Sequence, residues 1–321
     1  MPITVVGSIA YDTVKTPFGQ RERMLGGAAV HFALAASFFD EVRVVGPVGE
    51  DFGEQQLEVM RTRGVDVSDI ERIPGGRTFF WQGEYGWDLN SRETLDTQLG
   101  VFEGFQPKLS EQSRSSDVLF LANIQPDLQR EVRAQLHDAR FVALDSMNLW
   151  IDIARDSLVQ AIERVDCVIL NDAELRQLTG KPNLVSAARE ILSWAPSPAP
   201  DGTRGPSVIV AKQGEYGAAL ITRDGFFALP AYPLESVIDP TGAGDTFAGG
   251  LVGYIAAHPE EAISDDLLRR AMANATVLAS FNVEEFGTDR IVRLTGSEIV
   301  ARIQELHAMT QFSGGALEMR S

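Results

Sequence analysis

The segment Asp239–Leu251 holds the densest grouping of chemically useful residues, and it reads Asp-Pro-Thr-Gly-Ala-Gly-Asp-Thr-Phe-Ala-Gly-Gly-Leu. Gly242 and Gly244 remove side chains where a helix is expected to begin, so backbone N–H groups are free to face an anion. Asp245 follows in the first helical turn. Its carboxylate could simply complement the helix dipole. It could also take a proton from a hydroxyl while the N–H groups hold the charge of a transferred phosphoryl group.

Asn171 and Glu174 form a second pair with chemical potential, directly after a predicted buried strand. On a helix they share one face. They could be the N-cap and the third residue of a capping box, or polar groups at the end of a strand where α/β sheets bind ligands. The pair alone favours capping, and the presence of Asp245 shifts the balance to function. The chain has no GxxxxGK[ST] segment, which disfavours a P-loop site.

Two further segments are weaker signals. The carboxylate of Asp12 can accept two hydroxyl hydrogen bonds, which suits a diol; the alternative is a turn residue after the first strand. In Lys212–Gly217, the two glycines Gly214 and Gly217 allow a tight backbone path, which by itself indicates only a hairpin.

These residues must be positioned by strands that alternate with helices. Short apolar runs predict buried strands, and helical patterns separate them, which indicates βαβ units and a mainly parallel sheet. The predicted strands are 3–9, 42–48, 118–122, 141–145, 168–170 and 207–212, with a hairpin of 217–222 and 225–229. The predicted helices are 26–39, 126–136, 152–163, 183–194, 243–257, 265–281 and 297–309.

Residues 72–103 have a different character, with aromatic side chains scattered among charged and polar ones. We expect them to form, together with residues 11–24, a small second β layer that acts as a lid. An ordinary edge hairpin is the alternative. Trp81 and Trp87 could stack on a base or a sugar, or could fill the lid or a dimer interface.

Composition excludes several classes of function. The 321 residues are 44% hydrophobic and 23% charged, which is typical of a folded globular protein. The net charge of −17 argues against nucleic-acid and membrane partners, which need a basic surface. The single cysteine, Cys167, excludes an internal disulfide and fits a buried core thiol. No signal peptide or membrane span is evident, so we expect a cytoplasmic protein.

The segment at 239–250 resembles the C-terminal signature of the ribokinase-like (PfkB) family of sugar and nucleoside kinases. The resemblance implies that Asp245 is the catalytic base. It also implies that the N–H groups of Gly242, Ala243 and Gly244 form the anion hole. Other stretches fit the family in order, from Gly7 to Asn274, so the resemblance covers nearly the whole chain.

The resemblance assigns the nucleotide side of the site. Asn171 and Glu174 match the family's Asn-x-x-Glu motif, which organises Mg²⁺ and phosphate through water. Lys212, Gly214 and Gly217 match a turn that approaches the nucleotide phosphates. Asn274 falls near the adenine-side contacts of the family, although a solvent-facing helix position is an equal alternative.

The resemblance also assigns the acceptor side. Asp12 matches a substrate-binding aspartate, and Gly26 and Gly27 match a Gly-Gly pair that lets the substrate approach the backbone. The chain departs from the family pattern at Ala10 and at His31, because both positions often hold an Asn that helps to bind the sugar. His31 could bind substrate or pack in its apolar helix. These departures make ribose an unsafe assignment.

The resemblance implies a three-layer αβα sandwich in a single domain over residues 1–312, with the β lid and a flexible C-terminal tail at 313–321. The implied reaction is ATP- and Mg²⁺-dependent phosphorylation of a hydroxymethyl group on a small sugar or polyol. A nucleoside kinase is the alternative, and a sugar- or nucleotide-binding sensor without catalysis is a third reading. A monovalent cation such as K⁺ near Asp239 stays open, and an exposed lid edge favours a homodimer.

Overall fold

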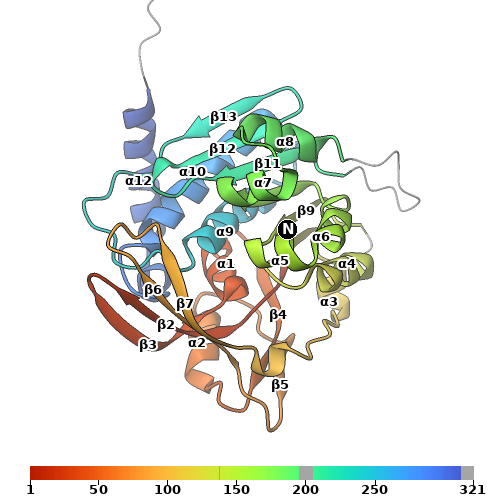
Figure 1. Cartoon of the computed structure of the whole chain (residues 1–321), viewed down its shortest axis with the longest axis vertical. Helices are drawn as coiled ribbons and strands as arrows, with labels where there is room; N and C mark the ends of the chain where they lie inside the picture. The colour runs from red at the N-terminus through yellow and green to blue at the C-terminus, as the bar shows by residue number, and fades with distance from the viewer. Residues whose placement is uncertain (137, 195–204, 312–321) are drawn as a thin grey trace, which may run out of the picture.

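The structure is a computed structural model that describes residues 1–136, 138–194 and 205–311 (Figure 1). The flexible tail expected at 313–321 lies outside these residues. So does the proline-rich stretch 195–204, which follows the predicted helix 183–194 and which we expected to be a surface loop rather than a domain linker.

A nine-stranded sheet forms the centre of the molecule, in the order β13-β12-β11-β10-β9-β8-β1-β4-β5. All neighbouring strands from β11 to β5 run parallel, and only β12 and β13 are antiparallel additions at one edge. The prediction of a mainly parallel sheet with a terminal hairpin is therefore confirmed. The strands are β1 (Ile3–Val6), β4 (Val42–Gly49), β5 (Ile70–Ile73), β8 (Val118–Leu121), β9 (Phe141–Asp145), β10 (Cys167–Asn171), β11 (Val208–Lys212), β12 (Ala218–Thr222) and β13 (Phe226–Leu229).

Helices cover both faces of this sheet, because its strands are apolar on both sides. Within β1, Val5 packs into one buried cluster and Val6 into the other. The first cluster includes helices α1 (Ala28–Ala36), α2 (Glu54–Thr62), α9 (Ala243–Ala256), α10 (Asp265–Asn282), α11 (Asp289–Arg293) and α12 (Gly296–Thr310). The second includes α4 (Pro126–Gln135), α5 (Asn148–Ile153), α6 (Arg155–Ile162), α7 (Asp172–Thr179) and α8 (Leu184–Leu192). The three-layer αβα sandwich is confirmed (Figure 1).

A separate four-stranded sheet lies beside the sandwich, drawn in red and orange in Figure 1. Its order is β3-β2-β6-β7, from β2 (Ala10–Thr16), β3 (Gly19–Gly26), β6 (Phe79–Tyr85) and β7 (Arg92–Gln98). It is a mixed sheet, since β2 runs antiparallel to β3 but parallel to β6. The second β layer predicted from the aromatic-rich region is therefore present.

Some boundaries differ from the sequence prediction. The first strand ends at Val6, so Gly7–Ile9 lie beyond it. The helix expected at 152–163 is two helices, α5 and α6, because Ala154 between them has the non-helical angles φ −142° and ψ 34°. The short helices α3 (Glu111–Arg114) and α11 have no counterpart in the predicted pattern.

Two predictions about the chain as a whole can be compared with the structure. Cys167 is fully buried in β10, and burial raises the pKa of its thiol, as expected of a core cysteine. Within the described ranges, every helix is too short or too polar to cross a bilayer.

Candidate active site

Three neighbouring parallel strands end in polar residues at one edge of the large sheet. These are Asp145 on β9, Asn171 on β10 and Lys212 on β11. The register pairs Asn171 with Lys212, and Ile169 with Asp145. Ligands of open α/β sheets bind outside this edge, so the topology alone marks it as the place to look for a site.

Helix α9 begins at this edge, and its first residues require glycine. Gly242 is the N-cap with φ +74°, a left-handed conformation that favours glycine. A Cβ there would also lie 2.3 Å from the imidazole of His31. A Cβ at Gly244 would lie 3.0 Å from Nζ of Lys212, so the ammonium group reaches the first turn of the helix. The segment thus presents unblocked backbone beside a cation.

Asp245 lies in the first turn of α9. Burial, followed by the negative charge of Asp145, raises the pKa of Asp245 to about 7, although Lys212 and Arg92 act in the opposite direction. A carboxyl group with a pKa close to neutral can exchange a proton at physiological pH, which a general base must do.

Lys212 is held by an ion pair that sequence reasoning did not find. Its Nζ lies 3.1 Å from Oδ2 of Asp145, and both side chains are largely buried. Burial opposes the charged ammonium, but the carboxylates of Asp145 and Glu174 raise the pKa of Lys212. Ser146 N–H donates to the other oxygen of Asp145 at 2.7 Å. The only sequence signal for Asp145 was its place as the polar end of an apolar strand.

Asn171 and Glu174 form the capping box that was one of their two interpretations. The Asn171 N–H donates to Glu174 Oε2 at 2.8 Å, and the Glu174 N–H donates to Asn171 Oδ1 at 2.7 Å. Burial raises the pKa of Glu174 to about 7, while the nearby ammonium of Lys212 lowers it. The capping role therefore places the Glu174 carboxylate beside Lys212, so the two interpretations are compatible.

Asp12 lies within β2, so its alternative interpretation as a turn residue is wrong. Its carboxylate lies against Gly26, where a Cβ would be 1.9 Å from Oδ2. Gly27 is the N-cap of α1 with φ +98°. Burial, with a further contribution from Asp239, raises the pKa of Asp12 to about 7.

His31 is buried beneath the start of α9. Its Nδ1 is 3.2 Å from Oδ1 of Asn282, whose Nδ2 donates to the Thr241 carbonyl at 2.8 Å. That second bond fixes the amide orientation, so Nδ1 carries the proton and donates. Burial lowers the pKa of His31, which keeps the ring neutral. His31 therefore packs in its helix, as one interpretation held, and also supports Gly242.

The turn after β11 is the short helix η2 (Gly214–Tyr216), with Gly214 at φ +58° and Gly217 at φ +101°. A Cβ at Gly217 would lie 2.0 Å from the Leu229 carbonyl oxygen, so this glycine is required by the hairpin. Asn274 is buried in α10 and donates to the Arg270 carbonyl at 2.9 Å, a bond within its own helix. The contacts described do not join Asn274 to the cluster.

The small sheet contributes two residues to the site that the sequence did not indicate. Thr241 Oγ1 donates to the hydroxyl of Tyr85, at the end of β6, at 3.2 Å. Arg92 begins β7, and its charge lowers the pKa values of Asp12, Glu174 and Asp245. Neither residue follows a recognisable motif.

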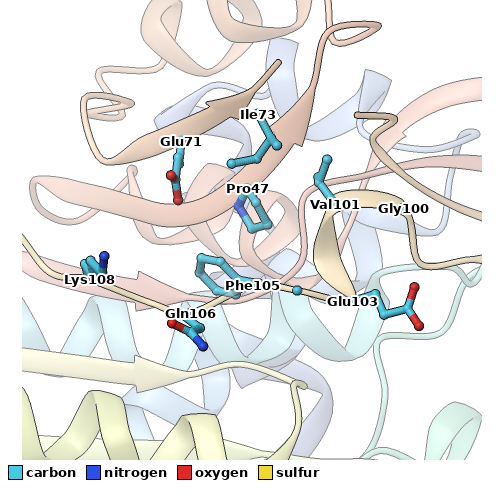
Figure 2. Close-up of a pocket in the computed structure, with 10 residues that line it drawn as sticks. Pro47, Glu71, Ile73, Gly100, Val101, Glu103, Phe105, Gln106 and Lys108 are labelled. Atoms are coloured by element: carbon cyan, nitrogen blue, oxygen red, sulfur yellow. The ribbon is translucent and has the colours of Figure 1, made fainter. Parts of the chain in front are cut away.

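No group of three or more His, Cys, Asp or Glu side chains is arranged to hold a metal ion in the part of the chain that the structure describes. Glu174 is the acidic side chain that the resemblance assigns to Mg²⁺ through water, and its carboxylate lies near the ammonium of Lys212. The hollow shown in Figure 2, of about 600 Å³, is a separate feature. It lies beside Pro47, Ile73 and Phe105 and includes none of the candidate residues.

The fold is an open α/β sandwich with acidic side chains, a lysine and a glycine-rich helix start at one edge of its sheet, and comparison with known proteins gives the family. Residues 3–293 match the pfkB family of carbohydrate kinases. The chain therefore belongs to that family, and it is a kinase that acts on a sugar or a nucleoside.

Individual relatives include both kinds of kinase. The chain is 30% identical over 268 residues to a cytidine kinase of Thermococcus kodakarensis, covering 81% of this chain and 91% of the relative. It is 31% identical over 276 residues to a fructokinase of Klebsiella pneumoniae, covering 80% and 85%. The fructokinase of Vibrio cholerae O395, solved with fructose, ADP and calcium bound, shares the fold with a TM-score of 0.74 at 18% identity, covering 94% of this chain and 98% of that one.

Proposed function

We propose that this kinase transfers the γ-phosphoryl group of ATP to a hydroxymethyl group of a small sugar or polyol. The observation that carries the proposal is the half-buried carboxylate of Asp245, with a pKa raised to about 7, in the first turn of a glycine-rich helix start. The relatives support ATP-type chemistry, since one of them was solved with ADP and a divalent ion.

In the proposed reaction, Asp12 accepts hydrogen bonds from the acceptor's hydroxyls, and the backbone at Gly27 lets the acceptor approach. Asp245 takes the proton of the reacting hydroxyl. The acceptor oxygen forms a bond to the γ-phosphorus, and the bond from that phosphorus to the β,γ-bridging oxygen breaks. ADP leaves with the electron pair. Lys212 and the N–H groups of Gly242, Ala243 and Gly244 hold the charge of the transferred group.

Glu174 and Asn171 are the residues that would hold Mg²⁺ through water, beside Lys212. When bound, the ion would neutralise phosphate charge.

We further propose that the small sheet acts as a lid within a single domain, and that its exposed edge supports a homodimer. A monovalent cation at Asp239 stays an expectation of the family. Both carboxylate oxygens of Asp239 accept backbone N–H bonds, from Thr241 at 2.9 Å and from Gly287 at 3.0 Å.

A nucleoside acceptor is the second candidate, and two observations favour it. The half-buried ring of Trp81 lies on the small sheet close to Arg92, where an aromatic surface could stack on a base. One relative is a cytidine kinase. A nucleoside presents the same hydroxymethyl group, so the proposed chemistry is shared by both candidates.

The test is an ADP-release assay with Mg-ATP against pentoses, hexoses, inositols and nucleosides. We expect release that depends on a sugar or polyol and is lost in Asp245→Asn. Release with nucleosides alone would replace the proposed acceptor class by the second candidate. A chain that binds Mg-ATP by calorimetry but releases ADP with no acceptor would be a binding sensor, contrary to the proposal.

A further inference from the structure

The segment that leads into α9 is a tight β-turn. The Ala243 N–H donates to the Pro240 carbonyl oxygen at 3.2 Å, which closes the turn over four residues. Gly242 is the third of them, with φ +74° and ψ −1°. These angles are those of a type II turn, in which glycine is usual at this place because its φ is positive.

The peptide group in the middle of this β-turn could take two orientations. A type I turn differs from a type II turn chiefly in this peptide group, which is rotated by about 180° while the ends of the turn stay in place. A glycine accepts both forms, since it adopts negative and positive φ values about equally well. The local sequence therefore does not decide which way the peptide group between Thr241 and Gly242 points.

Asn282, the last residue of α10, holds this peptide group in one orientation. Its side chain is fully buried, and its Nδ2 donates to the Thr241 carbonyl oxygen at 2.8 Å. A trans peptide group is planar, so its C=O and its N–H point in opposite directions. The bond to Thr241 therefore directs the Gly242 N–H away from Asn282. Among the residues that the structure describes, none accepts a hydrogen bond from that N–H.

Two further contacts keep the Asn282 amide in place. Its Oδ1 accepts a hydrogen bond from the Thr246 hydroxyl at 3.0 Å, and Nδ1 of His31 lies 3.2 Å from the same oxygen. Flipping the amide would set Oδ1 against the Thr241 carbonyl oxygen and Nδ2 against the N–H of His31. Neither pair could then form a hydrogen bond, which is costly for buried groups. His31 and Thr246 thus orient the amide, and the amide orients the peptide group.

We propose that Asn282 is a positioning residue of the phosphoryl-transfer reaction, which aims the Gly242 N–H at the transferred phosphoryl group. The inference rests on the proposed function. The same hydrogen bond polarises the peptide group, so the Gly242 N–H becomes a stronger donor. In the other form of the turn, the Thr241 carbonyl oxygen would replace that N–H and repel the phosphoryl group. Asn282 therefore acts through Gly242, without contacting a substrate itself.

The test compares two substitutions of Asn282 in the full chain, with the best acceptor of the panel. Asn282→Asp keeps the shape and the oxygen that accepts from Thr246, but replaces the donor to Thr241 by a second oxygen. Asn282→Ala removes the whole amide without adding a charge. We expect each to lower kcat by about 10–100-fold with little change in the KM for ATP or acceptor. This loss is smaller than that of a whole anion-hole donor, because part of the population keeps the required orientation.

Ser280→Ala is the matched control on the same helix. Ser280 is also a buried polar residue, and its hydroxyl donates to the Val277 carbonyl oxygen at 2.7 Å, within α10. Its substitution should cost stability, as the Asn282 variants do, but leave kcat unaltered. Thermal unfolding measures the stability of each variant and shows that it is folded.

A second readout concerns binding without turnover. Mg-ADP together with aluminium fluoride and the acceptor imitates the phosphoryl group during its transfer, and calorimetry measures how tightly this combination binds. We expect Asn282→Asp to weaken its binding and to leave the binding of Mg-ADP alone unchanged. A purely structural role would affect both alike.

Two results would overturn the inference while leaving the proposed function intact. One is a wild-type kcat in Asn282→Asp, which would mean that the donor to Thr241 is not needed. The other is an equal loss of affinity for Mg-ADP with and without aluminium fluoride, which would leave Asn282 with a role in the fold alone. A wild-type chain that releases no ADP with any acceptor would overturn the proposed function itself, and this is seen before any variant is made.

Discussion

Three carboxyl groups of the site have pKa values raised toward neutrality, those of Asp12, Glu174 and Asp245. Asp12 is buried and the other two are half-buried at the same edge of the sheet, and loss of water around each carboxylate raises its pKa to about 7. Carboxylates in this state can gain or lose a proton near neutrality as ligands arrive, because phosphates and cations change the local charge. The roles of the three differ by position, and single substitutions should separate them.

Substitution of Asp245 by Asn should remove the proton acceptor and keep the side-chain shape. We expect kcat to fall by about 10²–10⁴-fold. In the wild type, the base must be deprotonated, so kcat/KM should rise as pH increases through about 7, the raised pKa of Asp245. A pH–rate profile from pH 5.5 to 8.5 measures this rise. Near-normal turnover in a folded Asp245→Asn protein would contradict the assignment.

Glu174 has a structural and a proposed functional role, which Glu174→Gln can separate. Gln also completes a capping box, so the hydrogen bond to the Asn171 N–H and the stability of α7 should be kept. The lost charge should raise the Mg²⁺ concentration needed for half-maximal activity. A Mg²⁺ titration at fixed ATP measures the shift, and thermal unfolding serves as the control. An unchanged titration would leave Glu174 with the capping role alone.

The start of α9 depends on helix α1, which lies beneath it and carries His31. The His31 ring occupies the space that a Cβ at Gly242 would need, and Asn282 joins this ring to the Thr241 carbonyl. Helices α1, α9 and α10 therefore fix the anion-binding backbone together. This explains why a histidine is accommodated in the apolar helix α1.

Gly242→Ala should both destabilise the fold and reduce activity. The left-handed backbone alone costs about 1–2 kcal/mol for a residue with a Cβ, and the overlap with His31, 2.3 Å away, adds an overpacking cost of about 1–3 kcal/mol. Urea unfolding measures the loss. The double variant with His31→Ala should be less destabilised than the two single losses together, because the overlap is removed.

Gly296→Ala is the matched control for that comparison. Gly296 also opens a helix, α12, but it has an ordinary φ and no atom within 4 Å of the added Cβ. Its substitution should leave stability almost unchanged. A loss in Gly296→Ala equal to that in Gly242→Ala would mean that helix-start glycines are generally needed here, and that His31 has no special part.

The start of α9 could be predicted because its chemistry is local. Glycines and an aspartate within four residues specify backbone amides and a carboxylate at a helix start. Asp145 and Arg92 could not be predicted in this way. Each reaches the site through strand order and through the seating of one sheet on another, which no short segment encodes. The break at Ala154 between α5 and α6 was missed because the apolar period continues across it.

Two hydrogen bonds near the site join the small sheet to the sandwich. Thr241 donates to Tyr85, and Asn90 donates to Glu215. The second is exposed, so it contributes about 0.5–1.5 kcal/mol. A contact of that size could bias the proposed lid between open and closed positions without locking it, so that substrates can enter and leave.

Asn90→Ala should therefore loosen the small sheet and admit water to the site. Water competes with the acceptor for the phosphoryl group, so ATP hydrolysis should rise relative to acceptor phosphorylation by about two- to tenfold, which corresponds to the loss of one such hydrogen bond. The ratio is measured as ADP released against phosphorylated acceptor formed. Glu93→Gln, an exposed change on β7, should leave the ratio unaltered. Combining Asn90→Ala with Glu215→Ala should add nothing, because each variant removes the same bond. An unchanged ratio in Asn90→Ala would show that the seating of the sheet does not depend on this contact.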